Sequence, residues 1–305
     1  MELRKLGSTP FEVSRIALGC VTFGREISQD DSFRLMDYAV EHGINLFDTA
    51  EAYGEGASER IVGAWLRATG SRDRIVLQTK VTTNFSPAHV QEALQRSLER
   101  LQCDAVDFYL MHSFDAERPL EESLASMQWA IASGLAKAIG CSNFNAAQLQ
   151  SAVDVARDCG LAPIEVLQPI YNLAARDAEK DLFPLCAANR IGVTSYSPLG
   201  AGFLTGKYTP DRGALPEGSR FAIKPAHADI YFNDANFEIV ERLRAASAKS
   251  GHSTAALAMG WVLQCHAIDS VLVGARHTGH IDNAIAALKA SSELAAIASE
   301  ALHAA

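Results

Sequence analysis

The chain has 305 residues and a mass of 32.8 kDa, and 48% of its residues are hydrophobic while 21% are charged. This composition predicts a folded protein with a large apolar core and excludes a disordered chain. The formal net charge of -9 argues against nucleic acid or an anionic membrane as a partner, because both attract basic surfaces. The amino terminus lacks the apolar core of a secretory signal, and no apolar run approaches the ~20 residues that span a bilayer. We therefore expect a cytoplasmic protein.

Cysteine and histidine spacing predicts neither disulfides nor a metal site. The six cysteines are scattered and include no C-x-x-C pair, which predicts reduced and mostly buried thiols. His277 and His280 form one H-x-x-H motif, but no set of glutamates or cysteines completes a ligand pattern around it. We expect no bound metal.

Short apolar runs alternate with amphipathic stretches along the chain. Residues 3–14 predict a β-hairpin. Eight apolar runs follow and predict strands at residues 15–20, 44–49, 74–80, 106–112, 135–142, 164–168, 191–197 and 270–275. The stretches between them predict helices at residues 31–42, 58–69, 87–101, 120–133, 146–159 and 178–189, and more helices follow the seventh strand. Ser58 and Ser86 are expected to cap two of these helices.

Alternating strands and helices require a parallel sheet, because each return to the same end of the sheet needs a crossover helix. Eight such units predict a (β/α)8 TIM barrel with an amino-terminal β-hairpin. The alternative is a doubly wound Rossmann fold, which should show G-x-G-x-x-G after its first strand, whereas residues 18–24 read LGCVTFG. No linker or repeat divides the chain, so we expect one domain over residues 1–305. A long loop, residues 198–233, follows the seventh strand.

Polar residues stand where the predicted strands end, and in a parallel barrel all of these ends open on one face. Each of them has an ordinary structural explanation when taken alone: a turn cap, a snorkelling lysine or a buried histidine. Their convergence favours a functional site. The residues concerned are Asp48, Lys80, His112, Ser142, Asn143 and Gln168, together with Tyr53 in the loop after the second strand.

This set of side chains suits proton delivery to a carbonyl group that becomes an alkoxide. The reference pKa of tyrosine is about 10, so Tyr53 needs a nearby cation to act as an acid near neutral pH. Lys80 can be that cation, Asp48 can hold it, and His112 can direct a carbonyl by a hydrogen bond. Protein side chains supply no hydride, so a nicotinamide cofactor is implied. Ser142, Asn143 and Gln168 have the groups to bind a carboxamide.

The chain resembles the aldo-keto reductase family from end to end. The motifs that carry the resemblance are INLFDTAEAYGEGASE, QTK, VDFYLMH, AIGCSNF, YSPLGAGFLTGKY and VLVGAR, and they occur in the family's order. The resemblance implies a barrel that binds NADP(H) without a Rossmann motif and a catalytic tetrad of Asp48, Tyr53, Lys80 and His112. It also implies a cofactor site that comprises Thr22, Asp48, Ser142, Asn143, Gln168, Tyr196, Ser197, Pro198, Leu199, Gly200, Lys207, Gly274, Arg276, His280 and Asn283. Tyr196 would stack on the nicotinamide, and residues 197–207 would follow the pyrophosphate.

Some positions depart from the family's pattern. Where the family usually has a glutamine and then a Glu-Asn pair for the adenosine, this chain has His280 and then Asn283 and Ala284. The strength of the preference for NADPH over NADH is therefore open, although Arg276 is retained. Four phenylalanines are expected to form an apolar rim around the substrate, namely Phe23, Phe85, Phe114 and Phe144.

We expect an enzyme that reduces a small aldehyde or ketone to an alcohol with NADPH. Two alternatives stay open. One is an NAD(P)+-dependent alcohol or sugar dehydrogenase. The other is a cofactor-binding regulatory subunit, because residues 21–28 and 43–54 are also similar to the β subunits of voltage-gated potassium channels. The sequence predicts neither the substrate nor the oligomeric state.

Overall fold

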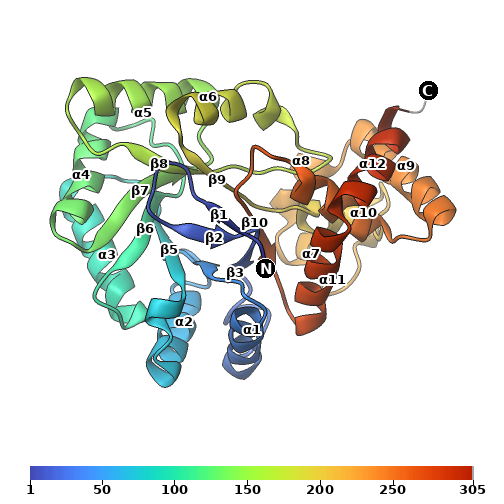
Figure 1. Ribbon diagram of the computed structural model, residues 1–305, viewed down its shortest axis with the longest axis horizontal. Coiled ribbons are helices and arrows are strands. Elements are labelled where there is room, and N and C mark those ends of the chain that lie inside the picture. The colour runs from blue at the N-terminus through green and yellow to red at the C-terminus, as the bar shows by residue number, and fades with distance from the viewer. Residues whose placement is uncertain (304–305) are drawn as a thin grey trace. The chain divides into compact units, whose positions relative to one another are not determined.

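A computed structural model describes residues 1–303 (Figure 1). Contacts between Cα atoms divide the chain into two compact units. The barrel unit comprises Met1–Pro169, Glu179–Ser195 and Ala267–Ile281. The second unit comprises Ile170–Ala178, Tyr196–His266 and the residues from Asp282 onward. Each unit is described separately below, and the single domain expected from the sequence stays a prediction.

Eight parallel strands close into a barrel, as the sequence predicts (Figure 1). They are β3 (Ile16–Gly19), β4 (Leu46–Asp48), β5 (Val76–Val81), β6 (Val106–Met111), β7 (Ala136–Ser142), β8 (Ile164–Gln168), β9 (Gly192–Ser195) and β10 (Ser270–Gly274). β10 pairs with both β3 and β9, which completes the ring. The strands are largely apolar and buried on both faces because one face fills the barrel and the other packs under helices. This fold is the (β/α)8 barrel.

Helices follow the first strands of the barrel unit (Figure 1). They are α1 (Gln29–Glu41), α2 (Ala57–Thr69), α3 (Pro87–Leu101), α4 (Leu120–Ala132), α5 (Ala146–Asp158) and α6 (Leu182–Asn189), with short 3-10 turns at η1 (Arg72–Arg74) and η2 (Asp177–Glu179). Ser86 caps α3, and its hydroxyl accepts from His89 N. The expected cap at Ser58 is wrong: Gly56 holds the cap position of α2, and Ser58 is buried inside the helix.

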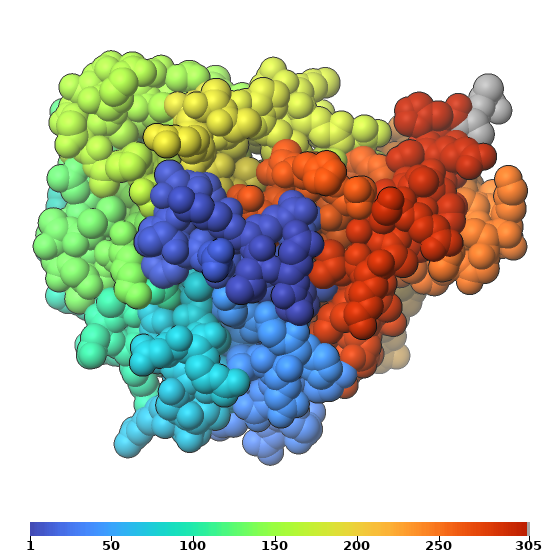
Figure 2. Space-filling model, viewed as in Figure 1, coloured from blue at the N-terminus to red at the C-terminus, as the bar shows by residue number. Residues whose placement is uncertain are grey.

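The amino-terminal hairpin covers the end of the barrel at which the strands begin. Its strands are β1 (Leu3–Lys5) and β2 (Glu12–Ser14), and they pair antiparallel. Ser14 N donates to Asn45 just before β4, and the Arg4 guanidinium donates to Ile268 O before β10. Figure 2 shows the atoms of the hairpin, in dark blue, lying over this end of the barrel. The opposite end, where the strands finish, therefore carries the predicted polar residues.

The second unit is mostly helical. Its elements are η3 (Gly200–Thr205), η4 (Arg212–Ala214), α7 (Arg220–Ile223), η5 (Pro225–His227), α8 (Ala228–Tyr231), α9 (Asp234–Ser250), α10 (Thr254–Gln264), most of α11 (Thr278–Lys289) and α12 (Ser291–His303). The expected long loop at residues 198–233 thus contains several short helices. Phe203 anchors them because its ring stacks on Tyr231 at 5.6 Å and meets Phe237 at 5.0 Å.

Within residues 1–303, none of the helices has the length and apolar character needed to cross a membrane. The same residues contain no group of three or more histidines, cysteines or acids arranged to hold a metal ion. All six cysteines are free, and three of them, Cys20, Cys141 and Cys186, are buried.

Candidate active site

Asp48 and Lys80 form a buried ion pair inside the carboxyl end of the barrel. Asp48 is the last residue of β4, and Lys80 stands near the end of β5. The Lys80 ammonium donates to Asp48 Oδ1 at 2.5 Å and to Thr49 O at 2.9 Å. Lys80 is 0% and Asp48 2% exposed. Because an isolated buried charge is costly, each member of the pair requires the other.

Tyr53 lies against this ion pair. Its hydroxyl oxygen accepts a hydrogen bond from Lys80 Nζ at 3.2 Å. His112 follows β6, and its ring meets the Tyr53 ring edge-on at a centroid distance of 5.7 Å. The structure therefore brings together the four residues that the sequence assigned to catalysis.

Backbone conformation explains why glycines follow Tyr53. Gly54, Glu55 and Gly56 all have positive φ values, of 57°, 53° and 80°, and form the turn that leads into α2. At Gly56 the positive φ favours glycine, because L residues with a side chain rarely adopt this conformation. Ser58, two residues later, bonds to Thr49 Oγ1 and donates to Cys20 O, both at 2.8 Å.

Burial and charge shift the pKa values of the site in different directions. Burial raises the pKa of Tyr53 above its ordinary value, and the positive charge of Lys80 offsets only part of this effect. Burial by itself would lower the pKa of Lys80, but Asp48 and Tyr53 together raise it above its ordinary value. Lys80 is therefore charged and Tyr53 protonated at neutral pH. As the sequence leads one to expect, Lys80 lowers the pKa of Tyr53, but burial has the larger effect, so the net shift is upward.

His112 is held in its neutral form. Burial, followed by the charge of Lys80, lowers the pKa of His112 to about 4, and Asp48 and Glu51 act against this shift. A neutral imidazole can donate one hydrogen bond but does not protonate a substrate near pH 7. Asn143 fixes the backbone at this point, because its Nδ2 donates to His112 O at 2.8 Å.

Gln78 belongs to the site and was not among the predicted residues. Its Nε2 donates to Asp48 Oδ1 at 2.6 Å, and Gln168 Nε2 donates to the same oxygen at 3.0 Å. Together with Lys80, three donors converge on one carboxylate oxygen. The period-2 rule for strands could have found Gln78, because it stands two residues before Lys80 and shares its face.

The other predicted barrel-unit residues lie at or just beyond strand ends. Ser142 Oγ donates to Gln168 O at 2.8 Å. Thr22 Oγ1 donates to Ala275 O at 2.8 Å, which joins the loop after β3 to the segment after β10.

Gly274 ends β10, and Arg276 is exposed. Arg276 N donates to His280 Nδ1 at 3.3 Å, and the rings of His277 and His280 lie 3.9 Å apart.

The predicted residues of the second unit lie in a loop with unusual backbone. Four of its residues have positive φ values, which are 57° at Ser197, 57° at Gly200, 56° at Ala201 and 89° at Gly202. A Cβ at Gly202 would lie 3.2 Å from Lys207 Nζ, so the lysine ammonium packs against this loop. Pro198 is buried, whereas Tyr196, Ser197 and Leu199 are half-buried and Asn283 is exposed on α11.

Three of the four phenylalanines expected at the rim are buried instead. Phe23, Phe85 and Phe144 are 0%, 1% and 3% exposed and belong to the packed interior. Phe114 is half-buried and meets the ring of Phe144 edge-on at 5.2 Å.

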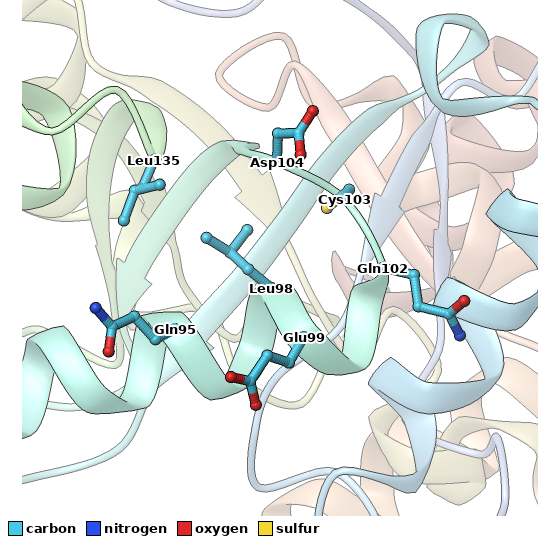
Figure 3. A pocket seen from close by; sticks show the side chains of 7 residues that line it. All are labelled: Gln95, Leu98, Glu99, Gln102, Cys103, Asp104 and Leu135. Atoms are coloured by element: carbon cyan, nitrogen blue, oxygen red, sulfur yellow. The ribbon is translucent and has the colours of Figure 1, made fainter.

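A shallow depression on the outside of the barrel unit carries no tetrad residue (Figure 3). It is lined by Gln95, Leu98, Glu99, Gln102, Cys103, Asp104 and Leu135. These residues lie on α3 and just before β6 and β7, near the strand beginnings and away from the carboxyl end of the barrel.

Comparison with known proteins agrees with this geometry. The model of the Aldo/keto reductase family matches residues 15–300. The chain belongs to the aldo-keto reductase family. As that name states, the family comprises reductases of aldehydes and ketones, so the chain is an oxidoreductase by membership.

The relatives of this aldo-keto reductase carry two kinds of name. A "Probable voltage-gated potassium channel subunit beta" of Oryza sativa subsp. japonica is 34% identical over 299 residues, which cover 92% of this chain and 89% of that protein. "Aldo-keto reductase YhdN" of Bacillus subtilis (strain 168) is 32% identical, covering 92% and 87% of the two chains. "Probable aldo-keto reductase 1" of Glycine max is 31% identical, covering 85% and 76%.

Proposed function

We propose that this protein reduces a small aldehyde or ketone to an alcohol with NADPH, and that Tyr53 donates the proton. The observation that carries the proposal is the buried chain of contacts from Asp48 through Lys80 to the Tyr53 hydroxyl, with distances of 2.5 and 3.2 Å. A general acid needs a proton at working pH and a partner that stabilises its conjugate base. Tyr53 has both.

The directions in which the pKa values of Tyr53 and Lys80 shift support proton transfer from Tyr53 to the substrate. Burial keeps the phenol of Tyr53 protonated before reaction because it raises the pKa, so the acid form is fully populated. When the proton moves to the carbonyl oxygen, the phenolate that remains is 3.2 Å from the Lys80 ammonium. The ammonium stabilises this anion in a site with little water, where a charge contact is stronger than in solution.

His112 orients the carbonyl group. Because its pKa is lowered to about 4, the imidazole is neutral and donates a hydrogen bond without competing with Tyr53 as a proton source. The side chain lies next to Tyr53, at 5.7 Å between ring centroids, so one carbonyl oxygen can meet both groups.

The barrel-unit residues fit a nicotinamide. Ser142, Asn143 and Gln168 stand together around the ends of β7 and β8, and their hydroxyl and amide groups complement the donors and acceptors of a carboxamide. A bound nicotinamide cofactor would supply the hydride. We assign the carboxamide contacts to these three residues, and further cofactor contacts to Thr22, which follows β3, and Gly274, which ends β10.

The loop of the second unit fits a phosphate group. Residues with left-handed backbone shape this loop into tight turns, in which Gly200 N donates to Ser197 O at 2.9 Å and Gly202 N donates to Leu199 O at 3.0 Å. Lys207 adds a positive charge beside Gly202. We assign phosphate binding to residues 197–207 and ring stacking to Tyr196. Arg276 and His280 are assigned to the 2′-phosphate of NADPH, and Asn283 to the adenosine.

Steady-state turnover tests the proposal. Purified protein is assayed with a panel of small aldehydes and ketones and with NADPH or NADH, and in the reverse direction with alcohols and sugars plus NADP+ or NAD+. We expect carbonyl reduction with NADPH to be the fastest reaction. Faster oxidation of an alcohol or sugar would favour the dehydrogenase alternative and overturn the proposed direction.

A regulatory subunit is the second candidate. It is favoured by the 34% identity to two plant proteins named as probable potassium channel β subunits. A cofactor-binding subunit of this kind would bind NADPH and show no turnover with any member of the panel. Binding of NADPH with no measurable reduction would therefore replace the first candidate by the second.

A further inference from the structure

The loop that carries Tyr53 is joined to β5 by successive hydrogen bonds. Thr49 N donates to Gln78 O at 2.9 Å, and Glu51 N donates to Lys80 O at 3.3 Å. These bonds continue the β4–β5 ladder beyond the end of β4, which finishes at Asp48. We call residues 49–56 the Tyr53 loop.

The ladder then passes from the backbone to a side chain. After Glu51 the main chain turns away from β5, because Tyr53 N bonds back to Ala50 O at 3.0 Å. At the next position along β5, the Glu51 carboxylate takes the place of a backbone carbonyl. Its Oε1 accepts from Thr82 N at 2.8 Å and from Thr82 Oγ1 at 2.7 Å. Glu51 thus ties the Tyr53 loop to the strand that carries Lys80.

From this arrangement we infer that Glu51 is a positioning residue for the reaction, because it fixes the Tyr53 loop relative to Lys80. The inference rests on the proposed function, since it assigns the Tyr53 contact with Lys80 to catalysis. Glu51 itself does not contact the Tyr53 hydroxyl in any described hydrogen bond. Glu51 acts through the backbone, because it stands two residues before Tyr53. Thr82, which donates to Glu51, stands two residues after Lys80.

The hydrogen bonds of Glu51, and not its charge, carry this role. Both contacts are made to one oxygen, and an amide oxygen can accept the same two hydrogen bonds. A glutamine should therefore hold the loop, whereas an alanine should release it. Release matters because a misplacement of about 1 Å in a catalytic group can cost about a hundredfold in rate.

Four variants separate the possibilities. Glu51→Ala removes both contacts, Glu51→Gln keeps the acceptor, and Thr82→Val removes the hydroxyl but keeps the backbone donor. Asp37→Ala is the matched control, because Asp37 Oδ1 accepts one hydrogen bond, from Trp65 Nε1 at 2.7 Å, on helices α1 and α2 away from the Tyr53 loop. It tests whether loss of any comparable contact has the same effect.

We expect a specific pattern in kcat. Glu51→Ala should lower kcat by about 10- to 100-fold, with the Kd of NADPH within about twofold of wild type. Glu51→Gln should stay within about threefold of wild type, and Thr82→Val should lose about two- to tenfold. Asp37→Ala should keep wild-type kcat even if its Tm falls.

Hydrogen–deuterium exchange gives a readout that does not depend on activity. Amides of the Tyr53 loop should exchange at least about tenfold faster in Glu51→Ala than in wild type, and at the wild-type rate in Glu51→Gln. Amides of β6 should be unchanged in both. This measurement decides the inference even if the wild-type protein reduces no carbonyl compound and the proposed function fails.

Three results would overturn the inference. The first is wild-type exchange of the Tyr53 loop in Glu51→Ala. The second is equal damage in Glu51→Gln and Glu51→Ala, which would assign the effect to charge. The third is an equal loss of kcat in Asp37→Ala, which would assign it to general destabilisation.

Discussion

Lys80 donates to the hydroxyl of Tyr53 at 3.2 Å while it is ion-paired with Asp48 at 2.5 Å. One buried cation therefore serves two partners. It neutralises the carboxylate before the reaction and is in place to stabilise the phenolate after proton transfer. In the proposed mechanism, the acid Tyr53 depends on a residue that does not itself carry the proton that is transferred.

Lys80→Met should abolish carbonyl reduction. Without the cation, the pKa of Tyr53 rises further because burial and the charge of Asp48 both raise it, and the phenolate loses its partner. We expect kcat to fall by at least about a hundredfold. Asp48→Asn should be milder, because Lys80 keeps its contacts with Thr49 O and Tyr53.

Lys137→Met is the matched control for Lys80→Met. Lys137 also pairs with a buried aspartate, at 2.7 Å from Asp107 Oδ1, but it stands at the start of β7 and away from the tetrad. It should lower stability and leave kcat unchanged. Normal kcat and pH dependence in Lys80→Met would contradict the role of the cation.

His112 should make the folded protein less stable in acid. The folded-state pKa of about 4 lies below the unfolded reference of about 6.5, so the unfolded chain binds the proton more readily. The free energy of unfolding should therefore fall as pH drops from about 6.5 to about 4. Above that window the histidine is neutral in both states and contributes no pH dependence.

Urea unfolding of wild type and His112→Gln measures this effect. Between about pH 7 and about pH 4.5, wild type should lose about 2 kcal/mol more than the variant, which lacks the titrating group. Other groups titrate in both proteins, so only the difference between their losses of unfolding free energy reports on His112. Equal losses would mean that the pKa of His112 is not lowered by folding.

Arg276 should determine the choice between the two nicotinamide cofactors. It follows β10, where barrels hold phosphate groups, and a guanidinium can bind the 2′-phosphate that only NADPH carries. A charge-assisted contact corresponds to a preference of about ten- to a hundredfold in Kd. Arg276→Ala should lose most of this preference by weakening NADPH alone.

Fluorescence titration with NADPH and NADH at low salt measures both dissociation constants. Arg67→Ala, which removes an exposed arginine from α2, is the control for net charge and should leave both values unchanged. A wild-type preference for NADH, or equal weakening of both cofactors in Arg276→Ala, would show that Arg276 does not read the 2′-phosphate.

The barrel could be predicted from the sequence because its signal is strong and repeated. Strands buried on both faces give apolar runs, and several of these runs end where a polar residue enters the carboxyl end of the barrel. Asp48, Lys80 and His112 were found in this way. Gln78 was missed because it stands inside an apolar run and is not at its end, although it donates to the same carboxylate oxygen as Lys80.

Other features depend on contacts that residue types do not specify. Ser58 resembles a helix cap in sequence, but the turn at residues 54–56 needs left-handed backbone and places Gly56 at the cap. The direction of the Tyr53 pKa shift depends on whether burial or the nearby cation is the larger effect, and burial is larger. Phe23, Phe85 and Phe144 were placed at the rim by sequence position, and only packing shows that they are buried.

Replacement of Tyr53 by phenylalanine tests the central claim most directly, because it removes the proton and little else. Tyr109→Phe is the matched control, since the Tyr109 hydroxyl is buried on β6 and has no hydrogen-bond partner within residues 1–303. Both variants are measured for kcat of aldehyde reduction and for the Kd of NADPH. The proposal predicts that Tyr53→Phe loses at least about a hundredfold in kcat with a Kd within about twofold of wild type, while Tyr109→Phe keeps both values. Retention of more than about a tenth of wild-type kcat in Tyr53→Phe would contradict the assignment of Tyr53 as the general acid.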